Sequence, residues 1–155
     1  MTAGTHILAG IVLASYLKLP IIPAALGSIF PDVDLKKGLP FPPKRNLFNA
    51  HRGITHHPAL VVVLFLCSIV LKDLVNRTVG VFLLSFTVGY ASHLLLDILT
   101  PLGIPYKTKY YPRLSLKLIK TGKLGELFVI LLLLSALIYQ AKNGSLNYSS
   151  FKIWH

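Results

Sequence analysis

A run of 21 residues from Val79 to Leu99 most constrains what this chain can fold into. It holds no lysine or arginine, and only His93 and Asp97, near its end, carry an imidazole or an acidic group. Because about 20 apolar residues cross a bilayer as a helix, the run predicts a transmembrane helix. The composition agrees: 54% of the 155 residues are hydrophobic and 14% charged, with a mean hydropathy of +0.65. Soluble domains carry about 25% charged residues.

Further apolar runs predict an all-α, polytopic membrane bundle of short helices. Pro58 to Leu71 and Glu126 to Ala141 are shorter runs, which could span with help from flanking residues or a thinned bilayer. Ile7 to Phe30 is interrupted by a lysine and two prolines, so we expect two short helices forming a hairpin or re-entrant pair. No repeat or linker divides the chain, which predicts a single domain over residues 1–155.

The charge balance favours a lipid partner. Sixteen Lys and Arg residues face five Asp and Glu residues, a net charge of +11, and in an apolar chain this excess suits anionic headgroups. No nucleic-acid motif accompanies it, so we expect no nucleic-acid partner. Cys67 is alone and cannot form an intrachain disulfide. No cation precedes the first apolar run, so we expect no cleaved signal peptide and keep His6 in the mature chain.

The polar connection before the last apolar run is predicted to lie at the membrane boundary. Arg113 to Leu118 alternates with period two, which is typical of a short strand or an interface-lying segment. Tyr106, Tyr110 and Tyr111 precede it. Tyrosines beside lysines and arginines are typical headgroup anchors, with substrate contact as the alternative.

Four of the five acidic residues border or lie within apolar segments: Asp32, Asp34, Asp97 and Glu126. A charged group at mid-bilayer costs at least ~2.5 kcal/mol, so function is the default hypothesis for such residues. Asp32 and Asp34 could converge on one cation or on two adjacent ones, although a solvated helix end has the same pattern. For Glu126, interaction with a helix dipole is the simpler account.

Histidines supply the complementary ligands. His93 and Asp97 are four residues apart on one helix face, where they could share a cation or simply form a hydrogen bond. The stretch from His51 to Pro58 contains three imidazoles and an arginine, Arg52. Imidazole is the commonest metal ligand and the guanidinium fork suits phosphate, whereas the alternative is a histidine-rich surface loop. His6 alone could equally be a packed or interfacial histidine.

Topology predicts that these residues meet. If the helix from Pro58 leaves one membrane face and the helix from Val79 returns to it, the histidine and aspartate motifs share that face. The candidate metal ligands are then His6, Asp32, Asp34, His51, His56, His93, Asp97 and Glu126. Eleven of the sixteen cations lie on the same side, so the positive-inside rule predicts a site facing the cytoplasm of a multi-pass inner-membrane protein.

The motifs resemble, in order and over most of the chain, those of the YdjM-type inner-membrane proteins. The matching elements are Thr5-His6, Gly27 through Pro31 to Asp34, His51 to His56, Gly89 to Asp97, and Thr100 to Gly103. The resemblance implies a membrane-bound metal-dependent hydrolase, phospholipase-like, with the seven histidines and aspartates above as its polar core and Glu126 as a late acidic residue. His57 departs from the family pattern, where a small residue such as serine is commoner, so it ranks below His56. A likeness to zinc-dependent phospholipases C is analogy only.

We therefore expect hydrolysis of a phosphoester in a lipid or another amphiphile at a centre of two or three divalent ions. Zn²⁺ suits mixed His and Asp ligands best, with Mn²⁺ or Fe²⁺ next. Arg52 would bind the phosphate, and Asp32 or Asp34 could act as general base beside metal-activated water. The alternatives are a metal- or proton-coupled transporter and a non-catalytic, metal-stabilised membrane protein. No serine triad or nucleophile elbow indicates acyl-ester cleavage.

Overall fold

The structure is a computed structural model that describes residues 1–32, 52–107 and 112–143. Within these ranges the chain is mostly helical. The α-helices are α1 (Ala3–Tyr16), α2 (Ile21–Ile29), α3 (Pro58–Val70), α4 (Arg77–Ile98) and α5 (Leu124–Lys142). A two-stranded antiparallel sheet joins β1 (Ile104–Pro105) to β2 (Arg113–Leu114). Short 3-10 turns cover Phe30–Asp32 and Ile54–His56.

Three helices among the described residues are long and apolar enough to cross a membrane. They cover Pro58–Val75, Arg77–Ile98 and Leu124–Lys142, with 18, 22 and 19 residues. The first and last are longer than their apolar runs, because α3 continues through a π-helical turn over Leu71–Val75 and α5 begins ahead of Glu126. The sequence therefore underestimated two helices, since polar residues at a helix end lower its hydropathy without ending the helix.

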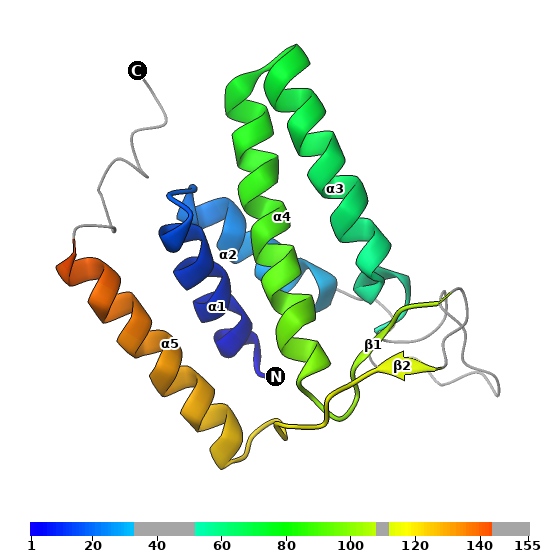
Figure 1. Ribbon diagram of the computed structural model, residues 1–155, viewed down its shortest axis with the longest axis vertical. Coiled ribbons are helices and arrows are strands. Elements are labelled where there is room, and N and C mark those ends of the chain that lie inside the picture. Colours follow the sequence, from blue (N-terminus) through cyan, green and yellow to red (C-terminus); the bar gives the residue numbers. More distant parts are fainter. Residues whose placement is uncertain (33–51, 108–111, 144–155) are drawn as a thin grey trace.

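Local capping fixes where α3 and α4 begin. Pro58 occupies the first turn of α3, and Nδ1 of His57 accepts a hydrogen bond from the Ala59 amide. At the start of α4 the Asn76 side chain accepts from the amides of Thr78 and Val79, which satisfies two donors that a helix start leaves open. The two helices lie side by side and antiparallel (Figure 1). The start of α3 and the end of α4 therefore lie at the same end of the bundle.

Glycines let α2 approach α4 closely. A Cβ atom at Gly27 would overlap the Phe86 carbonyl, and one at Gly89 would overlap the Ala24 carbonyl. Small residues allow helices inside a membrane to pack backbone against backbone. As a result, the end of α2, which includes Ser28, packs against the last turns of α4.

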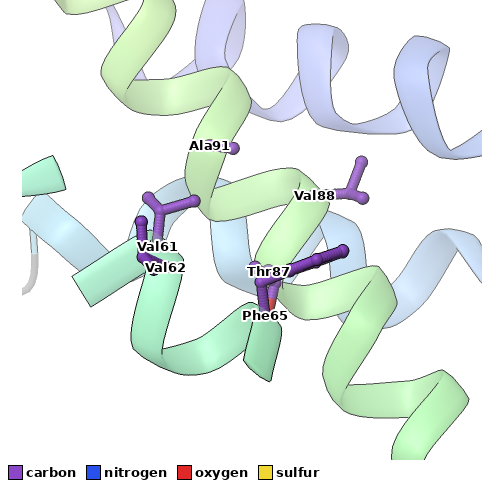
Figure 2. A pocket seen from close by; sticks show the side chains of 6 residues that line it. All are labelled: Val61, Val62, Phe65, Thr87, Val88 and Ala91. Carbon is purple, nitrogen blue, oxygen red and sulfur yellow. The ribbon is translucent and has the colours of Figure 1, made fainter. Parts of the chain in front are cut away.

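Much of the apolar surface faces outward, as expected for a chain solvated by lipid. The buried apolar cluster among the described residues is small: Tyr90, Leu94 and Ile104. Between α3 and α4 lies an apolar groove of about 320 Å³, lined by Val61, Val62, Phe65, Thr87, Val88 and Ala91 (Figure 2). Ala91 is two positions before His93, about 200° around the helix, so the groove opens away from His93 and adds no candidate ligand.

The connection from β2 to α5 closes the end of α4. The predicted strand over Arg113 to Leu118 forms only its first two residues, Arg113–Leu114. Beyond them, the amide of Leu116 donates to the Ile98 carbonyl at 2.8 Å, and that of Leu118 donates to the Leu99 carbonyl at 2.9 Å. A helix end leaves carbonyls without intrahelical donors. The amides beyond Leu114 bond to these carbonyls, so the strand does not continue to Leu118.

Candidate metal centre

His93 is fully buried on α4 and is held in one orientation by a backbone carbonyl. Its Nδ1 lies 2.7 Å from the Ser28 carbonyl at the end of α2. A carbonyl only accepts hydrogen bonds, so Nδ1 carries the ring proton and Nε2 keeps a free lone pair. Such a hydrogen bond from the far ring nitrogen is the usual support of a metal-binding histidine.

His56, at the end of a 3-10 turn before α3, faces His93. The two Nε2 atoms are 3.2 Å apart, and Nδ1 of His56 lies 3.1 Å from the Thr55 hydroxyl. The turn itself is fixed by Tyr90, whose hydroxyl donates to the Thr55 carbonyl. Both histidines are completely buried, so each presents one ring nitrogen to the same small volume.

Two carboxylates complete the group. Oδ2 of Asp97 lies 3.4 Å from Nε2 of both His56 and His93, and Oδ1 of Asp32 lies 3.6 and 3.8 Å from the same two atoms. A tetrahedral ion with bonds of about 2.0–2.1 Å separates its ligands by about 3.4 Å. Five separations, from 3.2 to 3.8 Å, therefore match the spacing of ligands around one ion.

The pKa of Asp32 is lowered below its usual value. Burial alone would raise it, but the hydrogen bond with His56 and the electrostatic interaction with His93 outweigh that effect. Asp32 is one-fifth exposed, whereas His56, His93 and Asp97 are inaccessible. Asp32 is thus an anion at the open side of the cluster.

His6, on α1, lies against the other side of His93. The two rings stack with centroids 3.8 Å apart, and Nε2 of His6 is 3.6 Å from Oδ1 of Asp97. His6 is completely buried, and neither of its ring nitrogens has a hydrogen-bond partner among the described residues. Because a buried polar atom without a partner is costly, these nitrogens fit a site that takes a cation.

Geometry defines two overlapping groups of ligand atoms that could hold a metal ion. One consists of His6, Asp32 and His93, and the other of His56, His93 and Asp97. Their convergence brings residues from α1, the end of α2, the turn before α3 and the end of α4 to one point. The cluster is therefore assembled from four separate parts of the chain.

Arg52 stands beside this cluster. Its Nη2 lies 2.9 Å from Oδ1 of Asp97, and its Nη1 donates to the Thr100 hydroxyl at 3.2 Å. Its backbone has a φ of +57°, an uncommon conformation for a residue with a side chain. Arg113 on β2 donates to the Arg52 carbonyl at 3.3 Å, which helps to hold this conformation. A buried guanidinium is thus fixed next to the carboxylates.

Of the three remaining predicted ligands, the structure describes only Glu126. Asp34 and His51 lie outside the described residues. Glu126 lies elsewhere: its Oε1 accepts from the Thr2 amide and the Thr5 hydroxyl at 2.6 and 2.7 Å, and its Oε2 accepts from the Gly122 amide at 2.6 Å. Glu126 thereby ties α5 to the start of α1 and belongs to neither group of ligand atoms. Its position fits an anchor for the helix that carries His6.

No role was predicted from the sequence for three supporting residues: Ser28, Tyr90 and Thr100. Ser28 acts through its backbone carbonyl, which no side-chain pattern can reveal. Tyr90 lies three residues before His93, almost one helical turn. The sequence shows this position but not the hydrogen bond that Tyr90 makes. Thr100 orients Arg52 and is itself held by a hydrogen bond to the Asp97 carbonyl at 2.8 Å.

Comparison with known proteins decides the family. Residues 1–151 match the family model of the YdjM inner membrane protein. The chain belongs to the YdjM family. This confirms the resemblance found in the motifs, and identifies an inner membrane protein. No curated protein and no solved structure matches the chain. Family membership thus establishes the location in the inner membrane. Evidence on the chemistry comes from the histidine and aspartate cluster.

Proposed function

We propose that this YdjM-family protein is a membrane-bound, metal-dependent hydrolase that cleaves a phosphoester in a lipid or another amphiphile. The observation that carries the proposal is the spacing of four ligand atoms: Nε2 of His56, Nε2 of His93, Oδ2 of Asp97 and Oδ1 of Asp32. Two imidazoles and two carboxylates are a donor set that suits Zn²⁺, with Mn²⁺ or Fe²⁺ next.

The described residues supply ligands for one ion more readily than for the two or three expected from the sequence. Both groups of ligand atoms include His93, yet its Nδ1 is occupied by the Ser28 carbonyl, so only Nε2 is available. A second ion would use His6 with Oδ1 of Asp97, 3.6 Å apart, and would need further donors. Asp34 and His51 remain our candidates for them.

Each residue has a distinct role in the proposed reaction. A bound divalent ion supplies a water of lowered pKa and neutralises phosphate oxygens. Arg52 offers its guanidinium to the phosphate and keeps Asp97 oriented through their 2.9 Å contact. Asp32, at the accessible side of the cluster, would be the general base if the ion leaves one of its oxygens free. Asp34 is the alternative base.

The location of the cluster suits a substrate that resides in the membrane. His93 and Asp97 are in the last turns of α4, and α5 begins after a polar connection at the same end (Figure 1). A headgroup at the membrane boundary would lie at this level, while its acyl chains stay among the spans. Because the sequence predicts eleven cations on this side of the membrane, we propose that it faces the cytoplasm.

The test is the simultaneous loss of metal and of hydrolysis. Wild type purified in detergent should bind a transition metal at one or more ions per chain and hydrolyse at least one lipid phosphoester. His93→Ala should lose both, because it removes a ligand. The matched control is His57→Ser, since His57 caps α3 outside the cluster and serine retains a capping oxygen.

The outcomes separate the three functional classes. Metal loss in His93→Ala without any wild-type turnover would support a non-catalytic metal protein. Ion flux in proteoliposomes that depends on His93, again without hydrolysis, would support the transporter. Absence of bound metal from the wild type would overturn the hydrolase and the structural-metal hypotheses together.

A further inference from the structure

The segment from Leu114 to Leu124 combines exposed leucines with exposed lysines. Leu116, Leu118 and Leu124 are 55%, 69% and 83% exposed, and the intervening lysines at 117, 120 and 123 are also exposed. In water such leucines would be an unfavourable surface. At a membrane boundary they can enter the acyl region while lysines extend to the headgroups.

Charge in this part of the chain is of one sign. From Lys107 to Gly125 the sequence holds six cations and no acidic residue. Glu126 follows, but it is buried and engaged by Thr2, Thr5 and Gly122. The exposed lysines therefore have no carboxylate neighbour along this segment, which favours an anion from outside the chain as their partner.

Hydrogen bonds hold the segment against the end of α4. Its amides at Leu116, Leu118 and Ile119 donate to the carbonyls of Ile98 and Leu99 at the end of α4, at 2.8 to 3.0 Å. The Ser115 hydroxyl adds a hydrogen bond to the Thr100 carbonyl at 2.6 Å. The segment thus joins the end of one candidate span, α4, to the beginning of another, α5 (Figure 1). Both spans place it where headgroups lie.

We propose that the exposed face formed by Leu116, Lys117, Leu118, Lys120, Lys123 and Leu124 is a binding surface for anionic phospholipid. The leucines enter the outer acyl region, and the three lysines bind the phosphate-bearing headgroups. Since the segment is bonded to residues one to three positions after Asp97, it gathers anionic lipid at the end of the bundle that holds the candidate metal centre. This binding does not require that the centre is catalytic.

The test measures which lipids the intact, detergent-purified chain retains. Native mass spectrometry is carried out with an equimolar mixture of phosphatidylglycerol and phosphatidylcholine of identical acyl chains. Wild type should retain phosphatidylglycerol preferentially. A lysine near an anionic membrane surface contributes about 1 kcal/mol, which corresponds to about fivefold in binding. Lys117→Gln, Lys120→Gln and Lys123→Gln combined should therefore lower the preference at least about fivefold.

A matched control removes three cations away from this segment: Lys18→Gln after the end of α1, and Lys72→Gln and Arg77→Gln at the connection between α3 and α4. Lys18 has a φ of +56° and Lys117 has a φ of +55°. Each triple variant therefore replaces one lysine whose backbone is in the left-handed region. The control should keep the wild-type preference. Raising salt from about 0.1 M to about 1 M, which shortens the screening length from about 10 Å to about 3 Å, should weaken lipid retention by the wild type.

Equal retention of both lipids by the wild type would overturn the proposal. So would an equal loss in both triple variants, because binding would then follow net charge and not this surface. If the first triple variant does not fold, the single reversals Lys117→Glu and Lys120→Glu replace it. Each should lower the preference, and an unchanged preference in both would reject the surface.

Discussion

The guanidinium of Arg52 lies 2.9 Å from Oδ1 of Asp97, while the second oxygen of the same carboxylate faces His56 and His93. Asp97 thus faces Arg52 and His6 through one oxygen, and His56 and His93 through the other. A carboxylate that is already oriented by a contact to one oxygen loses little conformational entropy when its other oxygen binds an ion. This arrangement is consistent with the proposed role of Arg52 as a phosphate-binding residue that is not itself a ligand.

Replacing Arg52 should separate metal binding from turnover. Arg52→Ala should keep its metal, because His56, His93 and Asp32 are unchanged, but lose activity. A hydrogen bond to a charged group contributes about 1.5–3 kcal/mol, so kcat/KM should fall about ten- to hundredfold. Arg52→Lys restores the charge without the planar fork and should recover only part of that loss. Loss of metal from Arg52→Ala would instead make Arg52 a support of the ligands.

Glu126 should behave as an anchor and not as a ligand. Its oxygens accept from Thr2, Thr5 and Gly122. In Glu126→Gln an NH₂ group replaces one of the two accepting oxygens, so at least one of these donors loses its acceptor. The free energy of unfolding should fall by about 1–3 kcal/mol. The measurement is the thermal midpoint in detergent, alongside metal content. Unchanged metal with a lower midpoint fits the anchor, whereas loss of metal at an unchanged midpoint would return Glu126 to the ligand set.

The sequence indicated most of the residues that the structure brings together, because these candidate ligands lie in short motifs on apolar elements. The spacing of His93 and Asp97 placed both on one face of a predicted helix, and the return of that helix placed His56 at the same end. The structure brings these three residues together with His6 and Asp32. The sequence could not distinguish the position of Glu126, since an acid at a helix start has the same pattern whether it binds backbone amides or an ion.

The packing of α2 against α4 depends on close contacts at small residues. In the sequence these small residues are scattered and form no recognisable pattern. Hydropathy ranks a glycine in a helix as neutral, so the close approach of Gly89 to the Ala24 carbonyl was not predictable from the pattern. The same holds for the Ser28 carbonyl, which fixes the ring of His93. Both relations join residues that are more than 60 positions apart, and they exist only once the helices have packed.

Enlarging Gly89 should therefore loosen the candidate centre from a distance. A Cβ atom there would overlap the Ala24 carbonyl, and overpacking costs about 1–3 kcal/mol. Gly89→Ala should lower the thermal midpoint and the metal affinity together, because α2 carries Ser28 and leads to Asp32. Gly4→Ala is the matched control, since nothing lies within 4 Å of a Cβ at that helical position. Wild-type metal affinity in Gly89→Ala would show that the centre forms without this contact.

The end that carries the candidate centre should face the cytoplasm. Six cations lie between Lys107 and Lys123, and loops rich in lysine and arginine stay inside. In a Cys67→Ala background, Lys120→Cys and Lys72→Cys place single thiols at exposed positions at opposite ends of the bundle. A membrane-impermeant maleimide added to intact cells should label Lys72→Cys and spare Lys120→Cys until the cells are permeabilised. The reverse labelling pattern would place the centre outside, where a phosphoester substrate would have to come from the outer leaflet.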